Sequence, residues 1–260
     1  MPLSFQNKPS LVAYLTCGDP DLATSRDIAL AAIDAGADVI ELGVPFSDPV
    51  ADGPVIQRAS ERALRHGTTL HQVLEVGKEI RKRSAAGLII FTYLNPVMHM
   101  GLMKFSAAAQ DAGVDGALIT DLPVEESHDY LAEMRKRSLA TVFLAAPTST
   151  DERLKQIARS STGFVYAVSR TGVTGARQQM PEGAPKLVRR LRRYTSLPVA
   201  VGFGISSSAQ FEAVGKFADA AVVGSAIVET IERNAGKEAE SVAQFVRQLS
   251  AVSRQPSATR

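Results

Sequence analysis

Glu41 is the first residue whose type and setting suggest chemistry, because it interrupts the apolar run at residues 39–44, which reads VIELGV. Burying a carboxylate in such a run is costly unless the group is paired or protonated. Desolvation raises the pKa of a carboxyl group toward neutrality, which suits a group that gives and takes protons. We therefore predict a proton-transfer role for Glu41. The competing interpretation is a buried glutamate held by structural hydrogen bonds.

A second acidic candidate, Asp52, lies in a loop at positions 45–54 that is rich in proline and aspartate. A loop over the same end of the strand can carry its carboxylate back over the substrate of Glu41. Asp48 lies in this loop as well. Taken alone, a loop aspartate is more often a turn former than a catalyst.

Glycine-rich segments at residues 172–175, 202–206 and 224–225 suggest a site for an anion. Glycine lets backbone N–H groups approach an anion closely, and a helix N-terminus adds a positive partial charge. The competing interpretation is that these glycines only make tight turns. Because backbone donors need no lysine or arginine, the pattern predicts recognition of a terminal phosphate monoester on a small molecule.

Other catalytic chemistries lack their residues. No lysine stands at the end of a predicted strand, which argues against a Schiff-base aldolase, and the histidines lack ligand spacing, so we expect no metal site. Cys17 is more readily a small core residue than a nucleophile, since no histidine is placed to activate it. Two carboxylates and a phosphate site suit proton transfer on a phosphorylated carbon skeleton, as in isomerisation or carbon–carbon cleavage.

Composition narrows the class of protein further. The chain has 260 residues, 45% hydrophobic and 22% charged, with a net charge of +2, no tryptophan and 6% aromatic residues. Nucleic acid is therefore a poor first guess for a partner. The single cysteine cannot form an internal disulfide, no apolar run reaches membrane-helix length, and the N-terminus lacks a signal-peptide core. We expect a cytoplasmic protein that binds neither nucleic acid nor membrane.

The elements that must position these residues alternate regularly. Apolar runs typical of strands buried on both faces recur, and amphipathic helical patterns lie between them. Eight such units predict a single (β/α)8 TIM barrel with a parallel eight-stranded core, whereas six would fit a doubly wound sheet better. We assign residues 1–252 to this catalytic domain and residues 253–260 to a polar C-terminal tail that we expect to be frayed. The predicted strands are residues 11–17, 38–44, 88–94, 116–120, 140–146, 164–169, 198–203 and 220–226.

Predicted helices include residues 25–35, 70–83, 103–112, 125–137, 151–159 and 186–194. N-caps are expected at Thr150 and within residues 206–208, and a glycine C-cap within residues 34–38. Barrel enzymes carry their chemistry at the C-terminal ends of the strands. Glu41 and the three glycine-rich segments all fall at those ends, so the fold brings them to one face.

Six segments of the sequence carry a family resemblance. The long run at residues 40–54, ELGVPFSDPVADGP with its preceding isoleucine, resembles the signature of the tryptophan synthase α subunit family. It is joined, in the family's order, by GDP at 18–20, DLPVEE at 121–126, SRTGVTG at 169–175, GFGIS at 202–206 and GSAIV at 224–228. The resemblance covers nearly the whole chain.

The resemblance implies a lyase that cleaves indole-3-glycerol phosphate to indole and glyceraldehyde 3-phosphate in tryptophan biosynthesis. It also implies a pyridoxal-phosphate-dependent β subunit that receives the indole within an α2β2 tetramer. The cofactor is expected only in that partner, so this chain is expected to carry none.

The resemblance also assigns roles residue by residue. Glu41 and Asp52 match the family's catalytic carboxylates, Thr174 is implied in loop closure, and Asp48 and Pro49 fall in the β-facing loop. The phosphate is expected at Gly175, Gly204, Gly224 and Ser225. The indole and glycerol pocket is expected at Tyr14, Phe91, Tyr93, Leu118, Tyr166 and Phe203. Their competing interpretation is barrel core.

Two departures from the family pattern and two rival functions accompany this hypothesis. The segment before the first strand is short, so the helix that often plugs the barrel is expected to be reduced or missing, and Tyr14 replaces a common phenylalanine. The first rival is another phosphate-handling barrel enzyme, such as an isomerase or a sugar-phosphate epimerase. The second is a non-catalytic regulatory subunit, and the presence of both Glu41 and Asp52 argues against it.

Overall fold

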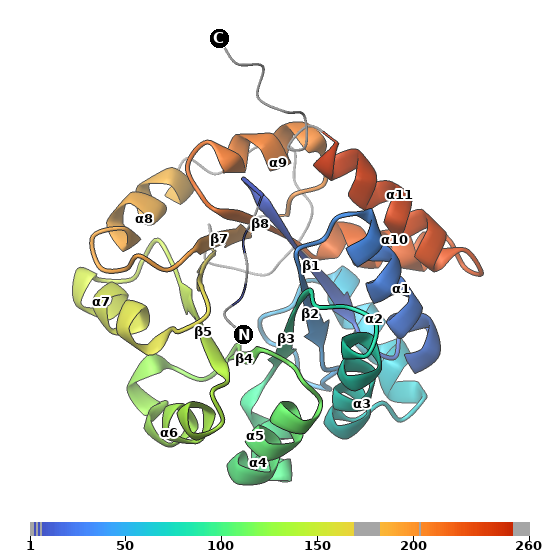
Figure 1. Ribbon diagram of the computed structural model, residues 1–260, viewed down its shortest axis with the longest axis horizontal. Helices are drawn as coiled ribbons and strands as arrows, with labels where there is room; N and C mark the ends of the chain where they lie inside the picture. Colours follow the sequence, from blue (N-terminus) through green and yellow to red (C-terminus); the bar gives the residue numbers. More distant parts are fainter. Residues whose placement is uncertain (1–2, 4, 6, 169–182, 203, 252–260) are drawn as a thin grey trace.

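Eight parallel strands close into a barrel within the residues that the computed structural model describes, which are 3, 5, 7–168, 183–202 and 204–251. Each strand pairs with the next along the chain, and β8 pairs with β1, so the predicted (β/α)8 architecture is confirmed (Figure 1). The tail at 253–260 lies outside the described residues. The strands are β1 (Ser10–Thr16), β2 (Val39–Gly43), β3 (Gly87–Thr92), β4 (Gly116–Ile119), β5 (Ala140–Ala145), β6 (Val165–Val168), β7 (Val199–Gly202) and β8 (Ala220–Val223).

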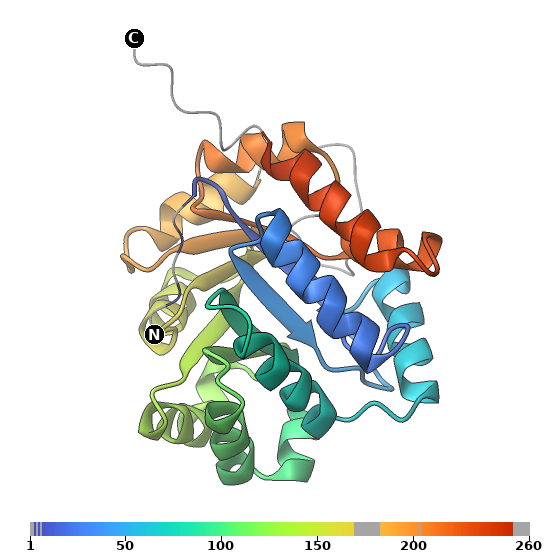
Figure 2. The same cartoon turned by 45° about the vertical axis from the view of Figure 1, so that its right-hand side comes forward.

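Helices form a ring outside the barrel (Figure 1). Helix α11 near the end of the chain lies alongside α1 near its start, so the two ends of the fold support each other (Figure 2). None of the helices in the described part of the chain combines the length and the apolar content needed to cross a membrane. The helices are α1 (Leu22–Ala35), α2 (Pro54–Arg65), α3 (Leu70–Arg81), α4 (Leu94–Met100), α5 (Leu102–Asp111), α6 (His128–Lys136), α7 (Asp151–Ser160), α8 (Gly183–Leu191), α9 (Ser208–Gly215), α10 (Ser225–Arg233) and α11 (Glu238–Ser250).

The predicted caps are present at the helix ends. Thr150 accepts a hydrogen bond from the N–H of Arg153, and Ser207 forms a capping box with Gln210. Gly36 ends α1 in the left-handed region with φ of 119°. The predicted helix at 125–137 is divided instead, because a 3-10 turn at Val124–Glu126 precedes α6.

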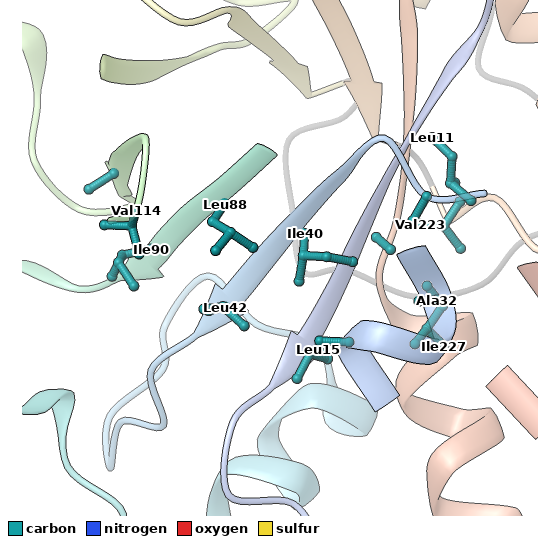
Figure 3. Packing of buried hydrophobic residues seen from close by; sticks show 14 of the residues in the cluster. Leu11, Leu15, Ala32, Ile40, Leu42, Leu88, Ile90, Val114, Val223 and Ile227 are labelled. Carbon is teal, nitrogen blue, oxygen red and sulfur yellow. The ribbon is translucent and has the colours of Figure 1, made fainter. Parts of the chain in front are cut away.

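Alternation along each strand separates two apolar layers. In β2, Ile40 and Leu42 pack in the layer between the strands and the helices, whereas Val39 packs inside the barrel. Figure 3 shows this outer layer, where Leu15, Ile40 and Leu42 lie on the face of β1 and β2 toward the helices. Side chains at the intervening positions therefore point into the barrel.

The N-terminal end of the barrel is sealed without a plug helix in the described residues. Phe5 packs edge-on against Phe164 inside the barrel, with ring centroids 5.6 Å apart. Leu3 lies against Gly87 and Gly163, close enough that a Cβ on either glycine would meet its side chain within 3.0 Å. Two apolar side chains of the short N-terminal segment thus occupy the bottom of the barrel.

Side-chain caps recur at this same end. The Oδ2 atom of Asp38 accepts a hydrogen bond from the N–H of Leu11 at 2.7 Å, so the residue before β2 caps the start of β1. Asp115, Thr162 and Asp219 cap the starts of β3, β5 and β7 in the same way. Each odd-numbered strand therefore has its first or second amide bonded by a side chain from the segment that precedes the next strand.

Candidate active site

Glu41 lies in the middle of β2 and points into the barrel, since its neighbours Ile40 and Leu42 point to the helix layer. It is 0% exposed, and neither carboxylate oxygen has a hydrogen-bond partner among the described residues. Burial without a partner disfavours the charged form and raises the pKa of Glu41 from its usual 4.5 to about 8. The group is therefore protonated at neutral pH. The competing interpretation, a glutamate held by structural hydrogen bonds, has no support among the described residues.

Asp52 is buried as well, at 5% exposure, although it lies in a loop between β2 and α2. Tyr93 donates its phenolic O–H to Oδ2 of Asp52 at 3.1 Å. Burial raises the pKa of Asp52 from 3.8 to about 6, and the Tyr93 hydrogen bond opposes this rise. The loop is further held where Gln57 donates to the carbonyl of Asp52 at 2.8 Å. Asp52 therefore ionises before Glu41 as the pH rises.

Aromatic rings line the space beside these carboxylates. Tyr14 is the pairing partner of Glu41 across β1 and β2, and it packs edge-on against Phe91 with centroids 5.1 Å apart. Tyr93 stacks on Phe46 at 5.0 Å. The pKa of Tyr14 lies well above its usual value, because of burial and then the negative charge of Asp52. Aromatic, partly apolar side chains thus surround Glu41 and Asp52.

The opposite side of the barrel contributes Tyr166 and Leu118. Burial, followed by the charges of Glu41 and Asp52, raises the pKa of the Tyr166 phenol, so both carboxylates act on this one hydroxyl. Tyr166 lies over Gly202, where a Cβ would meet its hydroxyl at 2.5 Å. Leu118 is fully buried in the inner layer beneath. Residues from β1, β2, β3, β4 and β6 therefore converge inside the barrel.

Part of the predicted anion site, at Gly224, lies beside Tyr14 of the aromatic wall. Gly224 immediately precedes α10, and a Cβ built there would touch the Cβ of Tyr14 at 3.5 Å. Ser225 is the first residue of that helix and is buried. Gly204 adopts φ of 83°, a conformation that favours glycine. Thr174, Gly175 and Phe203 lie outside the described residues.

Sequence reasoning missed two contributors to the site. Phe46, which stacks on Tyr93, had no role assigned, although an aromatic residue beside the acidic loop is a signal for one. Tyr93 was assigned only to the pocket, yet its hydroxyl donates to Asp52 and accepts a hydrogen bond from the N–H of Ala51 at 3.1 Å. Residues 41 positions apart cannot be paired by spacing alone.

The arrangement combines a protonated buried carboxyl, a second carboxyl that ionises more easily, and an aromatic wall at the C-terminal ends of the strands. In the described part of the chain, no group of three histidine, cysteine or acidic side chains could hold a metal ion. The fold and this end of the barrel define the class as a (β/α)8-barrel enzyme with acid–base residues at its mouth.

Comparisons with known proteins identify the family within this class. A model of the tryptophan synthase alpha chain family matches residues 2–256. The tryptophan synthase alpha chain of Solibacter usitatus is 52% identical over 95% of this chain and 93% of its own length. That of Burkholderia pseudomallei strain 1106a is 47% identical over 96% and 93%.

Solved structures give the same result. Mycobacterium tuberculosis tryptophan synthase matches with a TM-score of 0.89 at 37% identity, covering 96% of this chain and 94% of that one. A mutant tryptophan synthase alpha-subunit from Pyrococcus furiosus matches with a TM-score of 0.88 at 40% identity, covering 94% and 99%. The chain belongs to the tryptophan synthase alpha chain family. It is a lyase of tryptophan biosynthesis, in enzyme class EC 4.2.1.20.

Proposed function

We propose that this chain cleaves indole-3-glycerol phosphate by a retro-aldol reaction to indole and glyceraldehyde 3-phosphate. The observation that carries the proposal is the buried, unpartnered carboxyl of Glu41, with its pKa raised to about 8, near enough to Asp52 that the charges of both act on the Tyr166 hydroxyl. Two carboxyl groups whose surroundings separate their pKa values can divide acid and base roles between them. Membership of the family supports the same reaction.

Glu41 supplies the proton that starts the reaction. Its O–H protonates C3 of the indole, and the ring becomes a cation that can accept electrons. The Glu41 carboxylate then takes the proton of the adjacent glycerol hydroxyl. As that hydroxyl becomes an aldehyde, the carbon–carbon bond breaks and its electron pair returns to the ring. Glu41 ends protonated, as it began.

Asp52 stabilises the charge that develops on the ring. In its ionised form it accepts a hydrogen bond from the indole N–H, and this bond strengthens as the ring becomes positive. Tyr93 holds the Asp52 carboxylate by the 3.1 Å hydrogen bond and keeps it oriented. A loop carboxylate so held is in place before the substrate arrives, which lowers the cost of ordering it.

The remaining pocket residues have binding roles in this proposal. Tyr14, Phe91 and Leu118 contact the indole, and Tyr166 lies beside the glycerol carbons. The phosphate binds at the N-terminus of α10, where the helix dipole favours an anion, with Gly204, Gly224 and Ser225 in contact. For Gly175, Thr174 and Phe203, the phosphate, loop-closure and indole roles rest on the family resemblance alone.

The direct test is to offer indole-3-glycerol phosphate to the purified chain and to assay for released indole and aldehyde. We expect slow release by the chain alone. Glu41→Gln should bind the substrate through its phosphate and release no indole. An absence of indole from the unmodified chain under any condition would refute the proposal.

The partner we propose is a pyridoxal-phosphate-dependent β subunit that receives the indole in an α2β2 assembly. Exposed apolar side chains in the Asp52 loop and on α4 and α5 support a docking surface for it. Val50 is 79% exposed, Met98 56% and Met103 69%. A surface cavity of about 500 Å³ includes residues of α4, and it is lined by Val44, Pro45, Thr69, Leu70, His71, Asn95, Pro96, His99 and Met100. Such a patch is typical of a protein interface.

Adding a tryptophan synthase β subunit should raise the rate of indole release and produce a heterotetramer by light scattering. Met98→Glu should weaken that assembly because it places a charge in the apolar face. Leu64→Glu on α2 is the matched control, since Leu64 is also exposed but lies on another helix. Equal loss in both variants would remove the docking face from the proposal. The chain's location in the cytoplasm, and the cofactor's place in the partner alone, remain predictions from the sequence.

A further inference from the structure

Four charged side chains form a network that joins α2 to α10 and to the loop after β1. Arg62 on α2 donates through Nε and Nη2 to the two carboxylate oxygens of Asp19, at 2.7 and 2.8 Å. Its remaining Nη1 donates to Oε1 of Glu232 on α10 at 2.7 Å. Arg58, one turn earlier on α2, donates to both oxygens of Glu232 at 2.9 and 2.7 Å. We call these four residues the α2–α10 clasp.

One end of the clasp, at Asp19, is buried, while the other end, at Arg58, is exposed. Asp19 is buried and lies in the loop after β1, where the N–H of Gly18 donates to Ser25 of α1 at 2.9 Å. A bidentate guanidinium–carboxylate pair has a fixed geometry, so Asp19 holds Arg62 in one position. The Arg58 and Arg62 hydrogen bonds also hold the pKa of Glu232 down at about 2, so this carboxylate stays charged.

Both clasped helices begin at residues of the candidate site. Helix α2 starts at Pro54, two residues after Asp52, and α10 starts at Ser225. They run in the same direction, because Ile56 on α2 clusters with Val228 on α10, while Arg62 further along α2 meets Glu232 further along α10. The N-termini of α2 and α10 therefore lie side by side at the mouth of the barrel.

Tyr14 connects the clasped pair to the pocket wall. Its ring belongs to the small apolar cluster of Ile56, Ala59 and Val228 between the two helices. It also pairs across the strands with Glu41. A shift of α10 relative to the barrel must therefore repack Tyr14 or carry α2 with it, since packed interfaces do not deform continuously.

We propose that the α2–α10 clasp is a positioning device that couples phosphate binding at the start of α10 to the placement of Asp52 at the start of α2. This inference rests on the proposed function, because it takes the phosphate end and the acidic residue from it. Arg58, Arg62 and Glu232 touch no substrate and act through the two helices. A purely structural clasp would add stability but transmit nothing between the two ends of the pocket.

The test cuts the link at α10 and leaves the buried Asp19–Arg62 pair intact. Glu232→Ala removes the carboxylate that joins the helices. Glu229→Ala is the matched control, because Glu229 is on the same helix, one turn nearer the site, and pairs only with Arg233 within α10 among the described ion pairs. Glu232→Gln keeps the shape and part of the hydrogen bonding, so it should restore part of the coupling.

The first readout is hydrogen–deuterium exchange with and without inorganic phosphate. In the unmodified chain and in Glu229→Ala, phosphate should slow exchange both at residues 224–230 and at residues 50–57. In Glu232→Ala, protection at 224–230 should remain while protection at 50–57 is lost. Arg58→Met is a second variant, which cuts the link from the α2 side; it removes the two Arg58–Glu232 hydrogen bonds, leaves the Asp19–Arg62 pair and the Arg62–Glu232 bond in place, and should lose part of the protection at 50–57.

The second readout is turnover of indole-3-glycerol phosphate well below the melting temperature. We expect kcat of Glu232→Ala to fall about 10-fold with a smaller change in KM, because misplacing a reacting group acts on the transition state. Phosphate protection at 50–57 that survives in Glu232→Ala, or an unchanged kcat, overturns the coupling while leaving the proposed function standing. An unmodified chain that releases no indole overturns the proposed function and the coupling with it.

Discussion

Two acidic residues, one just before strand β2 and one in its middle, have opposite surroundings. Asp38, just before the strand, accepts hydrogen bonds from the N–H of Leu11 and from the Asn7 amide, both at 2.7 Å. Glu41, three residues further on, accepts none among the described residues although it is fully buried. One carboxylate beside β2 is therefore bonded to the backbone of the neighbouring strand β1, and one within β2 is buried without a partner among the described residues, as the proposed function requires.

The contrast extends over the whole barrel. At the N-terminal end, Asp115 and Asp219 also cap strand amides and pair with Arg81 and Arg192. At the C-terminal end, Asp52 receives only a phenol at its carboxylate among the described contacts, and burial raises its pKa. Hydrogen-bonded carboxylates add stability. Desolvated carboxylates reduce stability, and their raised pKa values lie near neutral pH, where a group can exchange protons.

The strongest test of this difference is to neutralise Glu41 within β2 and, in a separate variant, Asp38 just before it. Glu41→Gln should lower kcat for indole release by at least about 10³-fold, since it removes the only group that delivers the proton. Asp38→Asn should leave kcat close to normal and lower the free energy of unfolding by about 1–2 kcal/mol, because it weakens a charged cap. Steady-state kinetics and urea unfolding of both variants measure the two effects. A normal rate in Glu41→Gln would remove the distinction.

The second prediction concerns stability as a function of pH. The folded chain keeps the Glu41 proton up to about pH 8, whereas the unfolded chain loses it near 4.5. Folding therefore weakens as the pH rises through this window, and the loss is complete above the folded-state pKa. Glutamine does not titrate, so Glu41→Gln lacks this loss. The free energy of unfolding of the variant minus that of the unmodified chain should therefore rise by roughly 3–5 kcal/mol between pH 4 and pH 9. Urea unfolding at several pH values tests this, and a pH-independent difference would contradict a desolvated Glu41.

Asp52→Asn should reduce kcat by about 10²-fold, because asparagine cannot stabilise the positive ring as a carboxylate does. Binding of the phosphate end should be unaffected, so inorganic phosphate should inhibit the variant and the unmodified chain equally. Competition kinetics with inorganic phosphate provide the measurement. A rate within twofold of normal would exclude Asp52 from the mechanism.

The smallest expected effect sharpens the role of Tyr93. The rate should require ionised Asp52 and protonated Glu41, so it should fall below about pH 6 and above about pH 8. Tyr93→Phe removes the hydrogen bond that lowers the Asp52 pKa, so the acidic limb should move to higher pH by less than about one unit. The basic limb, which Glu41 sets, is the internal control. Movement of both limbs together would mean that Tyr93 acts on the whole pocket.

Much of the fold could be predicted because its signals are local. Continuous apolar runs indicated strands buried on both faces, and capping residues such as Thr150 and Ser207 marked helix starts. The division of the predicted helix at 125–137 was not predicted. The residues on both sides of Ser127 are polar and compatible with a helix, so the sequence does not mark the boundary between the 3-10 turn and α6. The positions of Leu3 and Phe5 at the bottom of the barrel were not predicted, because the N-terminal segment carries no periodic pattern that would place them.

The residue types by themselves determined the barrel, the acid within β2 and the direction in which it points, because strand periodicity depends only on neighbours in the chain. The tertiary structure decided which groups surround that acid. The Tyr93–Asp52 hydrogen bond, the absence of partners for Glu41 among the described residues and the clasp from Asp19 to Glu232 join residues that are distant in sequence. Burial and pairing depend on where loops and helices meet, and the pKa values follow from these contacts rather than from composition.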